Sequence, residues 1–166
     1  IQIANPLPLG IIGERELIDI WLEGTLIPAD IMKILNQGLP HGMHVIDVQE
    51  IEENGPSLPK QIDASEYRVE LFDSSVSAGI LSQSAQEILA KDSLPRVRNR
   101  KSYDLRPLIQ ELSIQENTDG RVSIFLKMPS NPSQTGRPEE VMAEMGIPQE
   151  NYRVSRTSLV FLDQYA

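Results

Sequence analysis

Hydrophobic and polar positions follow helical or strand periods in separate segments of the chain, and these segments predict its elements. In the first part, Pro28 suits the first turn of a helix and Gly38 suits its end. The predicted elements, in order, are an extended edge segment over residues 1–9, a strand over 16–22, a helix over 28–38 and a strand over 45–51. This part reads β-β-α-β.

A break with Gly55, Pro56 and Pro59 separates this part from the rest, where a longer order of elements follows. The predicted elements are a strand over residues 67–72, a helix over 77–90, a basic and partly extended stretch reaching Ile109, a strand over 121–128, a short helix over 137–145 and a strand over 154–162. This part reads β-α-β-β-α-β, the order of a ferredoxin-like unit.

The predicted fold class is therefore α+β, with two ferredoxin-like (βαββαβ) units in tandem and antiparallel sheets. We expect residues 1–57 to form a first unit truncated at its N-terminus, without its opening strand and helix. Residues 58–64 are the predicted linker, and residues 65–166 the second unit. The chain opens Ile1-Gln2-Ile3-Ala4 rather than with Met, so we expect a fragment. Since the opening strand is central in such a sheet, unpaired edges would remain, and we predict that the first unit associates with another copy of the chain or with a strand of its own second unit.

Composition excludes several classes of protein. The 166 residues carry a net charge of −9 and include no cysteine, so thiolate metal sites, iron–sulfur ligation and cysteine nucleophiles are excluded within them. Without a signal peptide or a long apolar run, we expect a soluble, cytoplasmic protein that does not enter a membrane. The charge is uneven, because residues 1–95 carry −10 and residues 96–166 carry +1. Any anion site must therefore be local.

A basic segment is the strongest candidate for such a site. Arg96, Arg98, Arg100 and Arg106 lie close together in sequence, and Asp104 is placed to orient Arg106 by an ion pair. Guanidinium groups bind phosphate, carboxylate or an RNA backbone in bidentate fashion. We predict that Arg137 and Arg156 converge with Arg106 in one anion-binding or substrate-binding pocket. The alternative is a solvated loop whose charges balance the acidic first half.

Other residue patterns indicate no catalytic or metal site. His41 and His44 flank a glycine without a carboxylate at a useful spacing, and the serines near residue 77 lack a nucleophile elbow and partners. Phosphate-binding and dinucleotide glycine motifs are absent. Trp21 is predicted either to be covered by a neighbouring segment or to serve as a stacking platform.

Six short strings resemble a bacterial family of radical-SAM-associated proteins, whose domain has no assigned function. They are Pro6–Gly10, Glu16–Leu22, Leu39–Met43, Tyr103–Ile109, Gly136–Val141 and Ser155–Thr157. The resemblance implies a domain that occurs alone or fused behind a radical-SAM enzyme, in some cases with a cobalamin-binding module. It also implies a strand and helix before residue 1. The iron–sulfur cluster, the S-adenosylmethionine and any cobalamin would belong to the attached enzyme.

These observations give three hypotheses in order of preference. The first is a non-catalytic accessory domain that recognises a substrate or partner for a radical-SAM enzyme, in cis or in trans. The second is an RNA-binding module acting through residues 96–106, which the acidic charge and the 5% aromatic content disfavour. The third is an independent enzyme that acts on a small anion through the arginine cluster.

Overall fold

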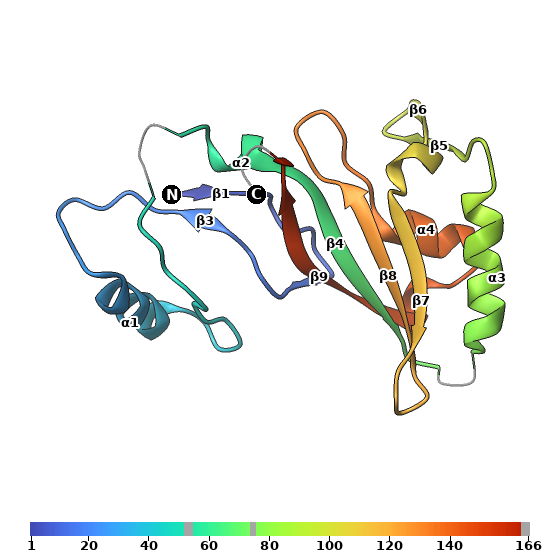
Figure 1. Ribbon diagram of the computed structural model, residues 1–166, viewed down its shortest axis with the longest axis horizontal. Coiled ribbons are helices and arrows are strands. Elements are labelled where there is room, and N and C mark those ends of the chain that lie inside the picture. Colours follow the sequence, from blue (N-terminus) through green and yellow to red (C-terminus); the bar gives the residue numbers. More distant parts are fainter. Residues whose placement is uncertain (52–54, 74–75, 164–166) are drawn as a thin grey trace.

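The computed structural model describes residues 1–51, 55–73 and 76–163, and shows a mixed α+β chain (Figure 1). Its elements, in chain order, are β1 (Gln2–Ile3), β2 (Ile11–Gly13), β3 (Ile18–Asp19), α1 (Pro28–Gly38), α2 (Leu58–Gln61), β4 (Ile62–Leu71), α3 (Ala78–Leu89), β5 (Pro95–Arg98), β6 (Lys101–Asp104), the 3-10 turn η1 (Arg106–Leu108), β7 (Glu111–Glu116), β8 (Val122–Pro129), α4 (Pro138–Glu144), the 3-10 turn η2 (Gln149–Asn151) and β9 (Tyr152–Phe161).

The largest sheet has the strand order β2-β9-β4-β8-β7. Its four long strands pair antiparallel: β4 lies between β8 and β9, and β7 pairs with β8. The short strand β2 adds to the outer edge of β9 in parallel orientation. Helices α3 and α4 lie on the same face of this sheet (Figure 1). Each helix therefore connects one strand to the next across a covered face.

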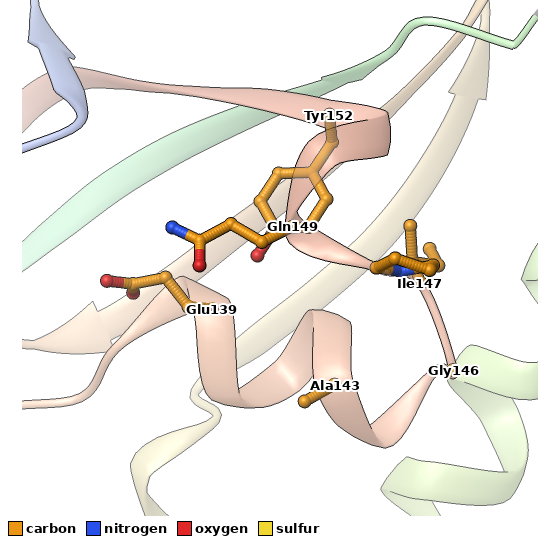
Figure 2. A pocket seen from close by; sticks show the side chains of 7 residues that line it. Glu139, Ala143, Gly146, Ile147, Gln149 and Tyr152 are labelled. Carbon is orange, nitrogen blue, oxygen red and sulfur yellow. The ribbon is translucent and has the colours of Figure 1, made fainter.

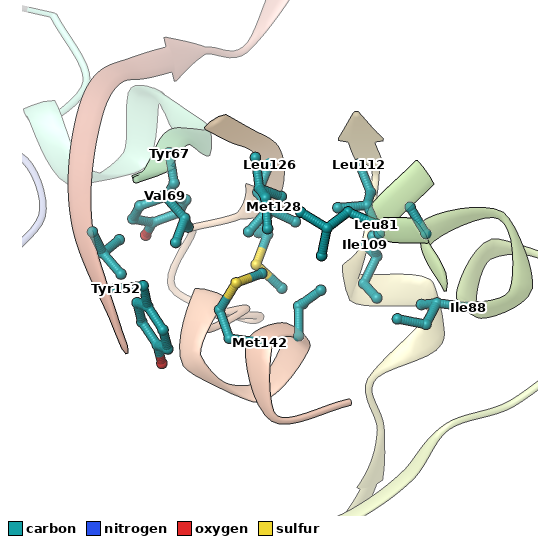
Figure 3. Packing of buried hydrophobic residues seen from close by; sticks show 14 of the residues in the cluster. Tyr67, Val69, Leu81, Ile88, Ile109, Leu112, Leu126, Met128, Met142 and Tyr152 are labelled. Atoms are coloured by element: carbon teal, nitrogen blue, oxygen red, sulfur yellow. The ribbon is translucent and has the colours of Figure 1, made fainter. Parts of the chain in front are cut away.

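The main core lies between the sheet and these two helices (Figure 3). Strand β8 turns alternate residues inward, because side chains of a strand point to opposite faces in turn. Its inward side chains are Val122, Ile124, Leu126 and Met128. Helix α3 contributes one apolar stripe, Leu81, Ala85 and Ile88.

The first 51 residues attach to this body through few buried groups. Ala4 packs with Leu58, Ile62 and Leu159 in a second, small cluster. Strands β1 and β3 form a separate two-stranded sheet. Helix α1 has no buried residue, and it lies at the opposite end of the molecule from α3 (Figure 1). Most apolar side chains of this segment are consequently exposed.

The predicted helices over 28–38, 77–90 and 137–145 are confirmed as α1, α3 and α4. The predicted strands over 121–128 and 154–162 are likewise confirmed as β8 and β9.

Two strand predictions in the first part were wrong or too long. Residues 45–51 alternate in polarity but form no strand, and only Ile18–Asp19 of the strand predicted over 16–22 is extended and paired. An alternating pattern becomes a strand only when a neighbour completes its hydrogen bonds. The predicted linker over 58–64 contains α2 and the start of β4, with Leu58 and Ile62 buried.

The basic stretch was also assigned to the wrong element. It forms its own hairpin of β5 and β6, and the second long strand of the unit is β7, further along the chain. Asn99 and Arg100 make the turn with positive φ angles of 52° and 64°. This conformation is typical of tight two-residue hairpins, in which both central residues have positive φ.

Candidate functional site

The hairpin arginines are held by carboxylates of α4. Arg96 forms an ion pair with Glu144, which Lys91 also contacts at 2.7 Å. Arg98 lies 3.9 Å from Glu140 and stacks over the Tyr103 ring at 5.0 Å. Each of these cations therefore already has an anionic partner within the chain.

The same contacts shift the pKa of two groups. Hydrogen bonds from Lys91 and Arg96 lower the pKa of Glu144. Burial, together with the hydrogen bond that its hydroxyl donates to Glu140, raises the pKa of Tyr103 to about 12. Both shifts favour the paired, structural form of this cluster at neutral pH.

Asp104 and Arg106 stabilise turns rather than form an ion pair with each other. The Arg106 guanidinium donates to the carbonyl of Leu89 at 2.8 and 3.1 Å, at the C-terminus of α3, and to the carbonyl of Ile109 at 3.3 Å. Asp104 accepts the backbone N–H groups of Leu94 and Arg106 at 2.7 and 2.9 Å. These bonds lower the pKa of Asp104. A cation at a helix C-terminus also complements the helix dipole.

Arg156 is 1% exposed and belongs to a different part of the molecule. Its Nε donates to Glu16 at 2.9 Å and its Nη2 to the carbonyl of Asn5 at 2.7 Å. Arg100 and Arg137 are exposed. The structure thus brings Arg96 and Arg98 to α4, while Arg106 and Arg156 make separate structural contacts. Neither of the two pockets described below is lined by Arg106, Arg137 or Arg156.

The face of the sheet opposite the helices carries paired charges. Arg68 lies 2.6 Å from Glu14, and Arg153 lies 2.7 Å from Glu70. A pocket of about 280 Å³ at one end is lined by Arg153, Glu70 and Arg121, and Arg121 in turn lies 3.5 Å from Asp119. An incoming anion would have to displace these carboxylates.

For RNA we expect weak binding, because Arg96 and Arg98 are engaged with α4. A titration with single-stranded and structured RNA near physiological salt should give a Kd no tighter than about 10⁻⁴–10⁻⁶ M, the nonspecific range. Tight, salt-sensitive binding that is lost on Arg98→Ala and Arg100→Ala would contradict this.

A second, more apolar pocket of about 360 Å³ lies between α4 and the segment that leads into β9 (Figure 2). Glu139 and Ala143 come from α4, and Gln149 and Tyr152 come from the facing segment. Gly146 ends the helix with a positive φ of 72°, which turns the chain back. The remaining walls are Ile147 and Pro148.

Glu139 is the charged group of this pocket. Its Oε2 atom is buried and has no hydrogen-bond partner in the described part of the chain. Burial raises the pKa of Tyr152, and the negative charge of Glu139 raises it further. The pocket therefore combines a carboxylate, a phenol and apolar walls, an arrangement suited to a cation with an apolar stem.

The sequence pattern indicated neither Glu139 nor Tyr152 as a site residue. Tyr152 reaches Glu139 because the chain reverses between α4 and β9. The Gly146-Ile147-Pro148 turn after a short helix was the available signal for that reversal. Similarly, Glu16 and Arg156 are 140 positions apart, and no local pattern connects them.

Two further features are missing from the described residues. No group of three or more His, Asp and Glu side chains is gathered there in a way that could hold a metal ion. No helix in that part of the chain has the length and apolar character needed to cross a membrane.

Comparison with known proteins gives one match. No curated protein and no solved structure matches the chain. Residues 1–138, which run from the N-terminal segment to the first residue of α4, match a bacterial family of conserved proteins. This match covers well over half of the chain. The chain therefore belongs to the family described as uncharacterized protein conserved in bacteria (DUF2344).

Proposed function

We propose that this chain is a non-catalytic accessory domain that docks a partner or substrate for a radical-SAM enzyme. The observation that carries the docking part is the exposed apolar side of α1. Large exposed apolar patches on soluble proteins mark interaction surfaces. The link to radical-SAM enzymes rests on the six sequence strings described above.

The apolar side of α1, formed by Ile27, Ile31, Ile34 and Leu35, is called the docking face here. Ile31, Ile34 and Leu35 follow the i, i+3, i+4 spacing of one helix stripe, and Ile27 is the N-cap residue just before the helix. Ile27 and Ile34 are 61% and 56% exposed, and no residue of α1 is buried. An amphipathic helix with such anchors is suited to an apolar groove on another protein surface.

Acidic side chains surround the docking face in sequence. The acidic side chains of this part of the chain include Glu23, Asp30, Asp47 and Glu50. The cation nearest to the docking face in sequence is Lys33. The exposed Trp21, Met43 and Ile46 extend the apolar surface on the flanking segments. The partner surface we expect is therefore an apolar groove with a basic rim.

The proposed chemistry belongs to the enzyme and not to this chain. A radical-SAM enzyme uses an iron–sulfur cluster, which cysteine thiolates hold. This chain has no cysteine and does not fit that role. Its contribution would be recognition, either on the same polypeptide as the enzyme or on a separate one, in the cytoplasm.

We also infer that residues 62–161 form a ferredoxin-like unit. The strand order β9-β4-β8-β7, antiparallel throughout, with α3 and α4 as crossovers on one face, supports this. The β5–β6 hairpin is then an insertion between α3 and β7. The tandem arrangement has less support, because residues 45–51 supply no strand for a first unit.

Replacing Ile34 with aspartate should weaken docking at least tenfold, because a charge would enter the centre of an apolar contact. The measurement is calorimetric titration of the chain with a reconstituted radical-SAM protein from the same genome. Ile80→Asp is the matched control, since Ile80 is an equally apolar helix residue that is 68% exposed on α3. It should bind like the unchanged chain.

Sedimentation of each variant alone separates this proposal from self-association. Self-association of the first unit, where it occurs, is expected at unpaired strand edges, so Ile34→Asp should not dissolve it. A dimer that Ile34→Asp does dissolve would assign the docking face to a second copy and overturn the proposal. Equal enzyme binding by the Ile34→Asp and Ile80→Asp variants would overturn it as well.

A further inference from the structure

We propose that the pocket between α4 and β9 binds a guanidinium or primary ammonium group carried on a short aliphatic chain. This site is separate from the docking face and involves none of the arginines singled out in the sequence. The pocket volume of about 360 Å³ lies within the range of small-ligand sites.

The first argument is the unpartnered oxygen of Glu139. A buried carboxylate oxygen without a donor loses hydration that nothing in the described residues replaces. The position of Glu139 in the first turn of α4 gives it some compensation from the helix dipole. That compensation supplies no hydrogen bond to Oε2, which is buried and unbonded. Oε2 itself is covered by protein atoms, so a ligand in the pocket would meet the charge of Glu139 at the exposed part of this half-buried side chain.

The second argument is the sign of the charge. Glu139 has no ion pair in the described residues, whereas its neighbour Glu140 contacts Arg98 and Glu144 contacts Arg96 and Lys91. In α4, Glu140 and Glu144 are thus paired with cations, whereas Glu139, on the pocket side, has no cationic partner in the described residues. A ligand that binds here is expected to be a cation.

The third argument is the rest of the lining. Ala143, Ile147 and Pro148 present apolar surface on which methylene groups can pack. Tyr152 presents an aromatic ring, and rings attract guanidinium and ammonium groups. The raised pKa of Tyr152 keeps its hydroxyl neutral, so the ring does not add a second negative charge at physiological pH. These features select a cation with an aliphatic stem over a compact, fully hydrated one.

The same chemistry occurs in a free alkyl guanidine and in an arginine side chain of a peptide. The test therefore uses agmatine and a blocked arginine, N-acetyl-arginine methylamide, in parallel NMR titrations of the full chain. Butylurea, which is planar and uncharged, is the ligand control. We expect the better of the two cations to bind with a Kd on the order of 0.1–1 mM, as for a ligand of this size. It should shift the signals of Ala143 and Ile147.

Glu139→Gln keeps the shape of the side chain and removes its charge, and it should weaken binding at least tenfold. Glu150→Gln is the matched control, because Glu150 is exposed on the neighbouring turn η2 and does not line the pocket. It should change the affinity less than twofold. Ile34→Asp, on the docking face, should leave it unchanged.

The relative affinities of agmatine and the blocked arginine identify the source of the group, a free small molecule or a peptide side chain. The proposal is overturned if neither cation binds with a Kd below about 10 mM, which is weak binding. It is also overturned if butylurea binds as well as the cations, or if Glu139→Gln and Glu150→Gln have equal effects.

Discussion

Replacing Arg156 with alanine should lower the free energy of unfolding by about 3 kcal/mol, the largest effect we expect from a single substitution in this chain. The guanidinium is 1% exposed and donates to Glu16 and to the Asn5 carbonyl. Its removal leaves a carboxylate and a carbonyl without donors and opens a void. The side chain of Glu16 is 28% exposed, so water can recover part of the loss.

This contact also joins two distant parts of the chain. Strand β2 pairs with β9, with Gly13 opposite Arg156. Glu16 passes over Gly13, where an added Cβ would lie 2.7 Å from Glu16 Cγ. Asn5 in turn donates to the carbonyl of Ser130 at 3.1 Å, after the end of β8. Arg156→Ala should therefore loosen residues 1–19 as well as lower global stability.

Arg153→Ala is the matched control for this prediction. Arg153 lies on the same strand and pairs with Glu70 at 2.7 Å, but its side chain is 53% exposed. An exposed ion pair contributes about 0–1 kcal/mol. Urea unfolding should separate the two variants, and hydrogen exchange over residues 1–19 should rise only for Arg156→Ala. Equal stability of the two variants would show that burial does not strengthen the Arg156 contact.

The helices were predictable from the sequence because the information that specifies them is local. The stripe of Leu81, Ala85 and Ile88 and the proline at the start of α1 both act within a few residues. Strand β8 was predictable for the same reason, since its alternation is long and regular. The first part of the chain was harder, because short strands such as β2 depend on a partner strand far along the sequence.

The role of the arginines could not be predicted from their clustering. Proximity in sequence indicated an anion site, but their acidic partners lie far away: Glu144 is 48 positions from Arg96, and Glu16 is 140 positions from Arg156. The chain has more acidic than basic residues, so an arginine is more often paired with a carboxylate than left unpaired at the surface. In such a chain a buried carboxylate oxygen without a hydrogen-bond partner, such as Oε2 of Glu139, is more informative than a cluster of arginines.

Gly136→Ala should lower the free energy of unfolding by about 2 kcal/mol through overpacking. Gly136 is buried in the loop between β8 and α4, and its N–H donates to the carbonyl of Pro129 at 2.9 Å. A Cβ at this position would lie 2.8 Å from the Cβ and Cε atoms of Met128 and 3.3 Å from the Leu108 carbonyl. The Cε atom of Met128 can move, but the Cβ of Met128 is held by strand β8 and the Leu108 carbonyl by the turn η1.

Gly79→Ala is the matched control, because Gly136→Ala and Gly79→Ala lower the conformational entropy of the unfolded chain by the same amount. In α3 the new Cβ would meet Ser77 Oγ alone among the described residues, at an ordinary 3.5 Å, and alanine is the better helix former by about 1 kcal/mol. Gly79→Ala should therefore match or exceed the stability of the unchanged chain in urea. A shift of α4 in the Gly136 variant would also disturb the contacts of Glu140 and Glu144, so the Tyr103 pKa should fall from about 12 toward its ordinary value. If Gly136→Ala is as stable as Gly79→Ala and the Tyr103 titration is unchanged, the prediction is wrong. The loop before α4 would then accommodate a Cβ at position 136 despite the close contacts with Met128.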